Sequence, residues 1–156
     1  MREIERKFLI NGDYRADVRS SVRIVQGYLN SDPNRAVRVR IRGGRGYLTV
    51  KGRGSESGMS RFEWEKEISA DDAESLMELC EPGVIDKIRH HVYYGGHLFE
   101  IDEFMGDNAG LTVAEIELGS EDEFFERPQW LGTEVTGDSR FYNASLSRCP
   151  YTRWNE

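Results

Sequence analysis

Charged side chains recur at alternate positions in several short segments of this chain, and their types could bind or transform a charged ligand. Near the N-terminus the sequence reads Glu3-Ile4-Glu5-Arg6-Lys7. If this segment is a strand, Glu3, Glu5 and Lys7 lie on one face, because strand side chains alternate between two faces. Two carboxylates and an ammonium group on one strand face are unusual, since charge is costly wherever water is scarce.

In later segments the charges are sorted by sign. The basic positions of the expected strands are Arg38, Arg40, Arg42, Lys51, Lys87 and Arg89. The acidic positions are Glu63, Glu65, Glu100, Asp102, Glu115 and Glu117. On any single strand such charges could simply face water, as one face of an antiparallel sheet commonly does. A solvated face would more often mix the two signs with uncharged polar residues, so the sorting favours an enclosed charged site.

The acidic and basic faces together indicate what ligand they would hold. Acidic pairs on neighbouring strands would repel one another unless protons or cations intervene. Their donor atoms are oxygens only, which favours a hard cation, Mg²⁺ or Mn²⁺. Several Lys and Arg side chains on an opposite wall would bind an anion with several charges, and a polyphosphate meets both requirements. A metal ion would bridge the carboxylates and the phosphate oxygens, with water as the nucleophile.

These residues need a frame of strands to position them. Alternation and turn residues predict strands over 3–10, 22–29, 36–42, 47–51, 61–68, 84–94, 97–104 and 112–118. A short strand over 134–136, a helix over 71–80 and a closing helix over 139–147 complete the elements. The glycine- and serine-rich segment 52–60 is typical of a flexible connection, with a lid as the alternative. About eight such strands suit a closed barrel, so we expect an α+β, mainly β fold: a closed eight-stranded antiparallel β-barrel, or tunnel, with a charged lumen and a few flanking helices.

Length and composition limit the class of protein. The 156 residues fit one domain, 1–156, and carry 28 acidic against 21 basic side chains. This acidic balance argues against a nucleic-acid partner. Cys80 and Cys149 lie far apart in the sequence, which favours a reducing compartment. With no signal peptide and no apolar run of bilayer length, we expect a cytoplasmic protein with no membrane partner, as a monomer or a homodimer.

The ordered motifs of the chain resemble those of the CYTH, or triphosphate tunnel metalloenzyme, superfamily. Glu3-Ile4-Glu5-Arg6-Lys7 is similar to its ExExK signature. The later blocks that resemble the family are, in order, Gln26-Gly27-Tyr28-Leu29, Arg38-Val39-Arg40, Leu48-Thr49-Val50-Lys51-Gly52, Glu63-Trp64-Glu65, Lys87-Ile88-Arg89, Glu100-Ile101-Asp102, Ala114-Glu115-Ile116-Glu117-Leu118 and Thr136-Gly137-Asp138-Ser139-Arg140-Phe141-Tyr142. ExExK alone is a weak signal, whereas ordered blocks along essentially the whole chain are a strong one.

The resemblance implies an eight-stranded antiparallel tunnel that binds a triphosphate together with a divalent metal ion. It implies that Glu115 and Glu117, with Asp102, hold the metal ion that engages the phosphates. It also implies that Glu3 and Glu5 form a second metal or water site, which positions the attacking water. The catalytic candidates are therefore Glu3, Glu5 and Lys7.

The resemblance also implies which side chains bind the phosphate chain. The basic residues in this role are Lys7, Arg38, Arg40, Lys51, Lys87 and Arg89. Glu63 and Glu65 would complete the lumen, and Tyr28 and Arg140 are further substrate-binding candidates. The closing helix would act as a plug.

Short bacterial members of this superfamily that begin in the same way resemble inorganic triphosphatases. The function expected is therefore hydrolysis of inorganic tripolyphosphate to pyrophosphate and phosphate. A class IV adenylate cyclase and a thiamine or nucleoside triphosphatase are the alternatives, although the chain shows no clear signal for binding a nucleobase. A polyphosphate or nucleotide sensor without catalysis is another, but it would tolerate loss of the acidic pairs, and all of them are present. Trp64, Trp130 and Trp154 are expected to be packing residues.

Overall fold

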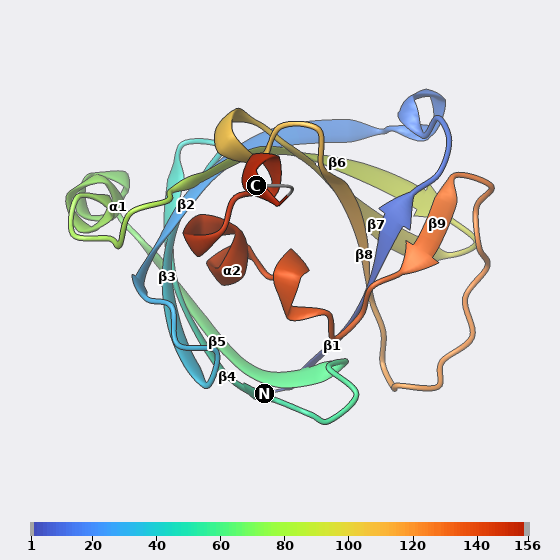
Figure 1. Cartoon of the computed structure of the whole chain (residues 1–156), viewed down its shortest axis with the longest axis horizontal. Coiled ribbons are helices and arrows are strands. Elements are labelled where there is room, and N and C mark those ends of the chain that lie inside the picture. The colour runs from blue at the N-terminus through green and yellow to red at the C-terminus, as the bar shows by residue number, and fades with distance from the viewer. Residues whose placement is uncertain (1, 155–156) are drawn as a thin grey trace.

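A ring of antiparallel strands forms the frame of this computed structural model, which describes residues 2–154 and, for Arg2 and Glu3, the backbone alone (Figure 1). The strands are β1 (Arg2–Ile10), β2 (Ser20–Asn30), β3 (Arg35–Arg42), β4 (Arg45–Gly54), β5 (Ser60–Ile68), β6 (Ile85–Tyr94), β7 (His97–Phe104), β8 (Thr112–Glu117) and β9 (Leu131–Glu134). The α-helices are α1 (Ala70–Met77) and α2 (Asn143–Arg148), and short 3₁₀ helices span Arg15–Asp17, Gly106–Asn108, Ser139–Phe141 and Tyr151–Arg153.

The strands close into a barrel. Neighbouring strands pair antiparallel in the order β5-β4-β3-β2-β6-β7-β8-β1, and β1 pairs back to β5, with Glu3 opposite Arg61. The additional strand β9 pairs with the last residues of β1, where β5 no longer covers that edge. The predicted closed eight-stranded antiparallel barrel is therefore confirmed. Because the ring is closed, the sheet has no free edge, and the side chains of each strand alternate between the inside and the outside of the barrel.

Alternation along each strand gives the barrel a charged inside and an apolar outside. On β3, Arg38 lines the lumen while its neighbour Val39 is buried on the other face. On the outside of β1, Phe8 belongs to an apolar cluster that includes Phe125 and Trp130. These two aromatic residues come from the irregular connection between β8 and β9. A loop as well as helices therefore covers the apolar outside of the barrel.

The helix α1 packs outside the barrel against β2, β3 and β4. Its N-terminus is capped by Ser69, whose Oγ accepts a hydrogen bond from the backbone N–H of Asp72 at 3.0 Å. Buried Ala73 faces Gly46 of β4, where an added Cβ would lie only 2.6 Å from the Cβ of Ala73. The absence of a side chain at Gly46 lets the helix approach the sheet closely.

The closing segment is not one continuous helix. Asp138 caps the 3₁₀ turn Ser139–Phe141, Tyr142 is extended with φ −70° and ψ 139°, and α2 follows. The helix predicted over 139–147 is thus interrupted at Tyr142. Figure 1 shows this segment lying across the interior of the ring of strands.

Two further local expectations differ from the structure. The short strand expected over 134–136 lies earlier in the chain, as β9, and shares only Glu134 with the expected range. Beyond it, the backbone N–H of Val135 still donates to the carbonyl of Lys7 at 2.8 Å. Trp64 is 45% exposed on the outer face of β5, whereas Trp130 packs on Phe99 with ring centroids 5.5 Å apart. Trp154 packs similarly on Phe141 at 5.2 Å.

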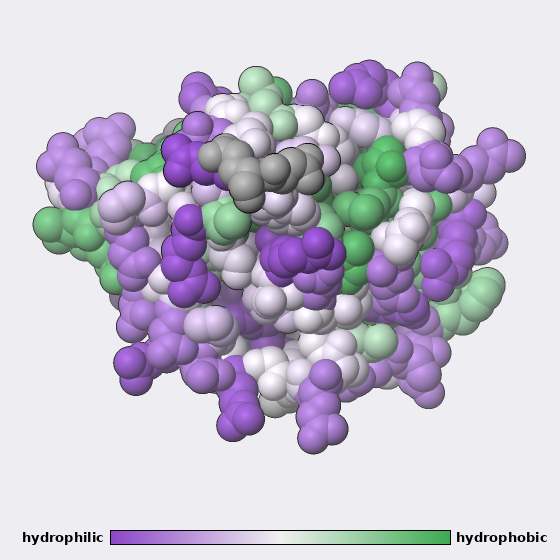
Figure 2. All heavy atoms as spheres, viewed as in Figure 1, coloured by the Kyte–Doolittle hydropathy of each residue, from purple (hydrophilic) through white to green (hydrophobic). Residues whose placement is uncertain are grey.

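The surface is dominated by polar residues on the face seen in Figure 2. None of the helices in the described part of the chain is long and apolar enough to cross a bilayer. Cys80 and Cys149 are both free thiols.

Candidate active site

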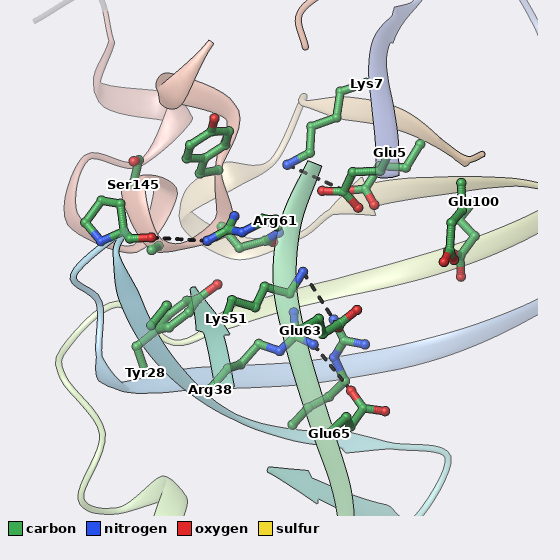
Figure 3. Close-up of a pocket in the computed structure, with 18 of the residues that line it drawn as sticks. Glu5, Lys7, Tyr28, Arg38, Lys51, Arg61, Glu63, Glu65, Glu100 and Ser145 are labelled. Atoms are coloured by element: carbon green, nitrogen blue, oxygen red, sulfur yellow. Dashed lines mark hydrogen bonds and ion pairs between the residues drawn. The ribbon is translucent and has the colours of Figure 1, made fainter. Parts of the chain in front are cut away.

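The lumen of the barrel holds a cavity of about 210 Å³ (Figure 3). The predicted site residues that line it are Glu5, Lys7, Tyr28, Arg38, Arg40, Lys51, Glu63, Glu65, Arg89, Glu115 and Glu117. They lie on seven strands, β1 to β6 and β8, that are widely separated in the sequence. The period-two pattern that put them on one face of each strand therefore brings them together in space.

Other predicted site residues do not line this cavity. Lys87 and Asp102 are buried behind the wall formed by Arg89. The side chain of Arg140 is 65% exposed and pairs with Asp138 at 2.7 Å, away from the lumen. The side chain of Glu3 lies outside the described part of the structure, although its backbone pairs with β5.

Arg38 and Arg40 form the centre of a basic wall on β3. The Nε of Arg40 donates a hydrogen bond to Oε1 of Gln26 at 3.0 Å. The Nη2 of Arg38 donates to Oγ1 of Thr49 at 3.3 Å and lies 3.7 Å from a carboxylate oxygen of Glu65. Burial, helped by the charge of Arg38, lowers the pKa of Arg40 to about 9. The surroundings therefore oppose the positive charge of this wall, and a bound anion would relieve that cost.

Asp102 holds two cations behind the wall. Its Oδ2 accepts hydrogen bonds from Nζ of Lys87 at 2.6 Å and Nη2 of Arg89 at 2.9 Å, and its Oδ1 accepts one from Nε of Arg89 at 2.8 Å. Burial opposes the charge of Asp102, but Arg89 and Lys87 outweigh it and hold its pKa well below the usual range. Burial lowers the pKa of Lys87 to about 7, against the opposing effect of Asp102. Both Asp102 oxygens are thus committed to orienting cations, which differs from the metal-ligand role expected for this residue.

The carboxylates of β1, β7 and β8 form an acidic wall, and β8 lies opposite β3 in the ring. Glu5 faces Glu117 across one strand pair, and Glu100 faces Glu115 across another. Like charges placed directly opposite one another are destabilising. The Nζ of Lys7 lies 3.6 Å from Oε1 of Glu115. Burial opposes the charge of Lys7, but Glu115 and Glu5 outweigh it and raise its pKa, so Lys7 remains a cation.

The donor atoms of the acidic wall fit a hard divalent cation. They are carboxylate oxygens, the ligands that Mg²⁺ and Mn²⁺ prefer. Within the described residues, no three acidic, histidine or cysteine side chains are already close enough together to hold a metal ion. The cross-strand pairs of like charge cost stability that a cation would offset, so this wall is where a metal ion fits best.

Several residues that line the cavity have no site role in the sequence analysis, among them Arg42, Arg61, Glu100 and Tyr142. Arg61 has the same phase as Glu63 and Glu65 on β5, so the alternation contained a signal for it. Arg42 and Glu100 belong to the charged positions of the expected strands, but sorting by sign alone gives them no specific role. Tyr142 has no periodic signal in the sequence. It reaches the lumen because the backbone is extended at this residue, between the 3₁₀ turn and α2.

The connection between β4 and β5 packs against the segment that precedes α2. This connection also contacts the loop between β8 and β9, where the Oγ of Ser57 donates to Oε1 of Glu121 at 2.8 Å. Gly58, at φ 78°, faces Gly137, at φ 80°, and a Cβ at Gly58 would lie 2.5 Å from the Cα of Gly137. The flexible connection expected over 52–60 is therefore shorter and is held by a close backbone contact.

Replacement of Gly58 by alanine is expected to destabilise the fold more than the same change at Gly44. Gly44 also has a positive φ, 81°, but an added Cβ there meets nothing within 4 Å. Gly44→Ala should lower the free energy of unfolding by about 1 kcal/mol, the cost of the left-handed backbone alone. Gly58→Ala should lower it by at least about 1 kcal/mol more, measured by urea denaturation. Equal losses would show that the contact with Gly137 carries no energetic weight.

A closed antiparallel barrel with a basic wall facing an acidic wall defines a class of tunnel proteins that hold a multiply charged anion. The CYTH domain matches residues 1–146, and the chain belongs to the CYTH family. It is 44% identical over 156 residues to an inorganic triphosphatase of Acetivibrio thermocellus, with 99% of each chain covered. It is 38% identical over 159 residues to an inorganic triphosphatase of Nitrosomonas europaea, covering 94% of this chain and 97% of the relative.

Solved structures show the same architecture. The crystal structure of an inorganic triphosphatase matches with a TM-score of 0.67 and 34% identity, over 93% of this chain and 97% of the other. A putative adenylyl cyclase from Hippeastrum matches with a TM-score of 0.61 over 76% of this chain and 80% of its own. Its identity is 14%, so it supports the fold alone.

Proposed function

We propose that this chain hydrolyses inorganic tripolyphosphate to pyrophosphate and phosphate, with Mg²⁺ or Mn²⁺ as cofactor. The observation that carries this proposal is the lumen itself, in which buried Arg38 and Arg40 face an acidic wall. A short phosphate chain and a divalent cation neutralise the two walls together. The relatives named inorganic triphosphatase, which match nearly the whole chain, support the same reaction.

The residues of the chain divide into two sets of roles. The phosphate chain is bound by Lys7, Arg38, Arg40, Lys51 and Arg89, with Tyr28, Glu63 and Glu65 completing the lining and Lys87 supporting Arg89. Glu5, Glu115 and Glu117 hold the metal ion, and Glu3 is assigned to the same wall by its place in the ExExK motif. When bound, the metal ion supplies Lewis acidity to the phosphate oxygens and favours the nucleophilic form of water. The basic wall stabilises the negative charge that develops on the leaving phosphate group.

The cavity favours an inorganic chain over a nucleotide. Its volume of about 210 Å³ is below the range of roughly 300–1,000 Å³ that small-molecule sites commonly have. Its lining is mostly charged, with Tyr28 and Tyr142 as the aromatic residues among the described side chains. A nucleobase would need an apolar surface, and Trp64, Trp130 and Trp154 do not line this cavity. These features weigh against the adenylate cyclase and the thiamine or nucleoside triphosphatase, and the intact acidic wall weighs against a sensor.

A phosphate-release panel tests the proposed reaction. Tripolyphosphate, ATP, thiamine triphosphate and pyrophosphate are each incubated with Mg²⁺, with Mn²⁺ and with excess EDTA, and cAMP is measured in the ATP reactions. We expect fast release from tripolyphosphate, at least about tenfold slower release from ATP, and loss of both in EDTA with recovery when metal is restored. Activity indifferent to chelation would overturn the metal assignment, and cAMP formation would favour the cyclase.

We infer that the chain works as a single domain, 1–156, with a small phosphate-containing substrate. The two free cysteines support a reducing, cytoplasmic location. The net charge of −7 weighs against a nucleic-acid partner. A monomer or a homodimer is expected.

A further inference from the structure

Arg61 spans one end of the cavity. It lies on β5 two residues before Glu63, and its Nη2 donates to the backbone carbonyl of Pro33 at 3.4 Å, in the turn between β2 and β3. Figure 3 shows its guanidinium reaching from β5 toward this turn, with the side chains of Lys7 and Lys51 pointing into the same space. The side chain therefore reaches from β5 past β4 to the turn between β2 and β3.

The charge of Arg61 lacks a carboxylate partner among the described side chains. The Nε of Arg61 is buried and has no hydrogen-bond partner in this part of the structure. By contrast, Lys7 pairs with Glu115 and Arg89 pairs with Asp102. A buried donor on a charged group is costly when unsatisfied, and a phosphate bound in the cavity that Arg61 lines would satisfy it.

At the same end of the cavity, the ring of Tyr142 lies near two cations, Arg61 and Lys7. Its ring centroid lies 5.8 Å from the guanidinium carbon of Arg61 and 5.0 Å from Nζ of Lys7. Tyr142 belongs to the closing segment, immediately before α2, and with Asn143 and Ser145 it lines the cavity. The end of the tunnel closed by α2 therefore gathers two cations around one aromatic ring.

We propose that Arg61 binds the terminal phosphate of the substrate at the end of the tunnel closed by Tyr142 and α2, and thereby selects chains that have a free end. The proposal rests on the proposed function, because it takes tripolyphosphate as the ligand. A terminal phosphate has three non-bridging oxygens and carries up to two negative charges, whereas an internal phosphate carries one. The planar fork of a guanidinium matches two oxygens of one phosphate, which a lysine cannot do.

The test compares linear tripolyphosphate with trimetaphosphate, a ring that has no terminal phosphate. Dissociation constants for both anions are measured by calorimetry in EDTA for the wild type, Arg61→Ala, Arg61→Lys and the control Arg45→Ala. Arg45 lies on β4, is 69% exposed, and does not line the cavity. Thermal unfolding of each variant confirms that the barrel is intact.

Arg61→Ala should weaken tripolyphosphate binding by about 10–100-fold and trimetaphosphate binding by less than about threefold. Arg61→Lys should recover only part of the loss, and Arg45→Ala should match the wild type. In turnover assays with metal, Arg61→Ala should raise KM far more than it lowers kcat. Unchanged tripolyphosphate binding, or equal weakening for both anions, would overturn the proposal. Since binding is measured without metal, this outcome is separate from failure of the proposed reaction, which would appear as wild-type protein that releases no phosphate.

Discussion

Replacing Glu115 with glutamine is expected to reduce hydrolysis of tripolyphosphate by at least about 100-fold, and Glu5→Gln should have the same effect. Glu115 lines the cavity, and its Oε1 lies 3.6 Å from Nζ of Lys7. An amide keeps the size of the side chain but has no negative charge to hold a divalent cation. The loss should appear in kcat, measured as phosphate release at saturating tripolyphosphate and metal.

The fold should survive both changes, because each one relieves repulsion between carboxylates. Glu115→Gln also gives up the 3.6 Å ion pair with Lys7, but Lys7 keeps the charge of Glu5 nearby. Glu115 faces Glu100 directly across the strand pair, so its neutralisation removes a like-charge contact. We expect the midpoint of thermal unfolding to stay within a few degrees of the wild type, or to rise. Glu74→Gln, at an exposed position on α1, is the matched control and should change neither property. Near-wild-type turnover in both lumen variants would remove the metal assignment from this wall.

The lumen could be predicted from the sequence because strand geometry converts a period of two into a face. Arg38 lies in the lumen and Val39 on the other face, as their alternation requires. Arg61 also lines the lumen, although the sorting of charges by strand does not predict it. It shares the phase of Glu63 and Glu65, but a basic residue on a face that is otherwise acidic falls outside a pattern that sorts strands by sign. Its phase on the strand predicts its place in the lumen correctly, whereas sorting the strands by sign does not.

Partners across strands could not be predicted, because they depend on register. Asp102 and Glu115 belong to similar acidic segments, Glu100-Ile101-Asp102 and Glu115-Ile116-Glu117. The register places Asp102 opposite Arg89, so it forms a buried ion pair, whereas it places Glu115 opposite Glu100. Register is set by the turns and by closure of the whole barrel, which no single segment encodes.

The closing segment shows the same dependence on tertiary structure. Arg140 was a candidate through the family resemblance alone, and its side chain pairs with Asp138 outside the tunnel. Tyr142, two residues later, reaches the lumen because its extended backbone turns the chain before α2. A continuous helix over this segment, as its sequence predicted, would place both side chains differently.

Removal of the Asp102 carboxylate is expected to be the most destabilising single change in the tunnel. Asp102→Ala removes the carboxylate that both Lys87, which is fully buried, and Arg89 share. Lys87 then keeps only the amide oxygen of Asn143 at 3.2 Å, and Arg89 keeps only Glu100 at 3.3 Å. Breaking a buried ion pair by removing one partner costs about 3–5 kcal/mol, because an uncompensated charge stays buried. The double variant Asp102→Ala, Lys87→Met should recover part of this loss, since it also removes the fully buried amine that has lost its carboxylate, whereas Arg89 keeps its ion pair with Glu100. Urea denaturation of the single and double variants at pH 7 measures both effects.

The pH dependence of stability separates the charge of Asp102 from its packing. Its pKa is lower in the folded state than in the unfolded chain, where it is about 3.9. The ion pairs therefore stabilise the fold at pH values above that figure, and the stabilisation is lost as the pH falls through the folded-state pKa. Asp102→Asn, which keeps the size but not the charge, should show a shallower fall in unfolding free energy between about pH 5 and pH 2 than the wild type. If the two proteins lose stability equally over this range, the Asp102 charge does not support the basic wall, and another contact must hold Lys87 and Arg89 in place.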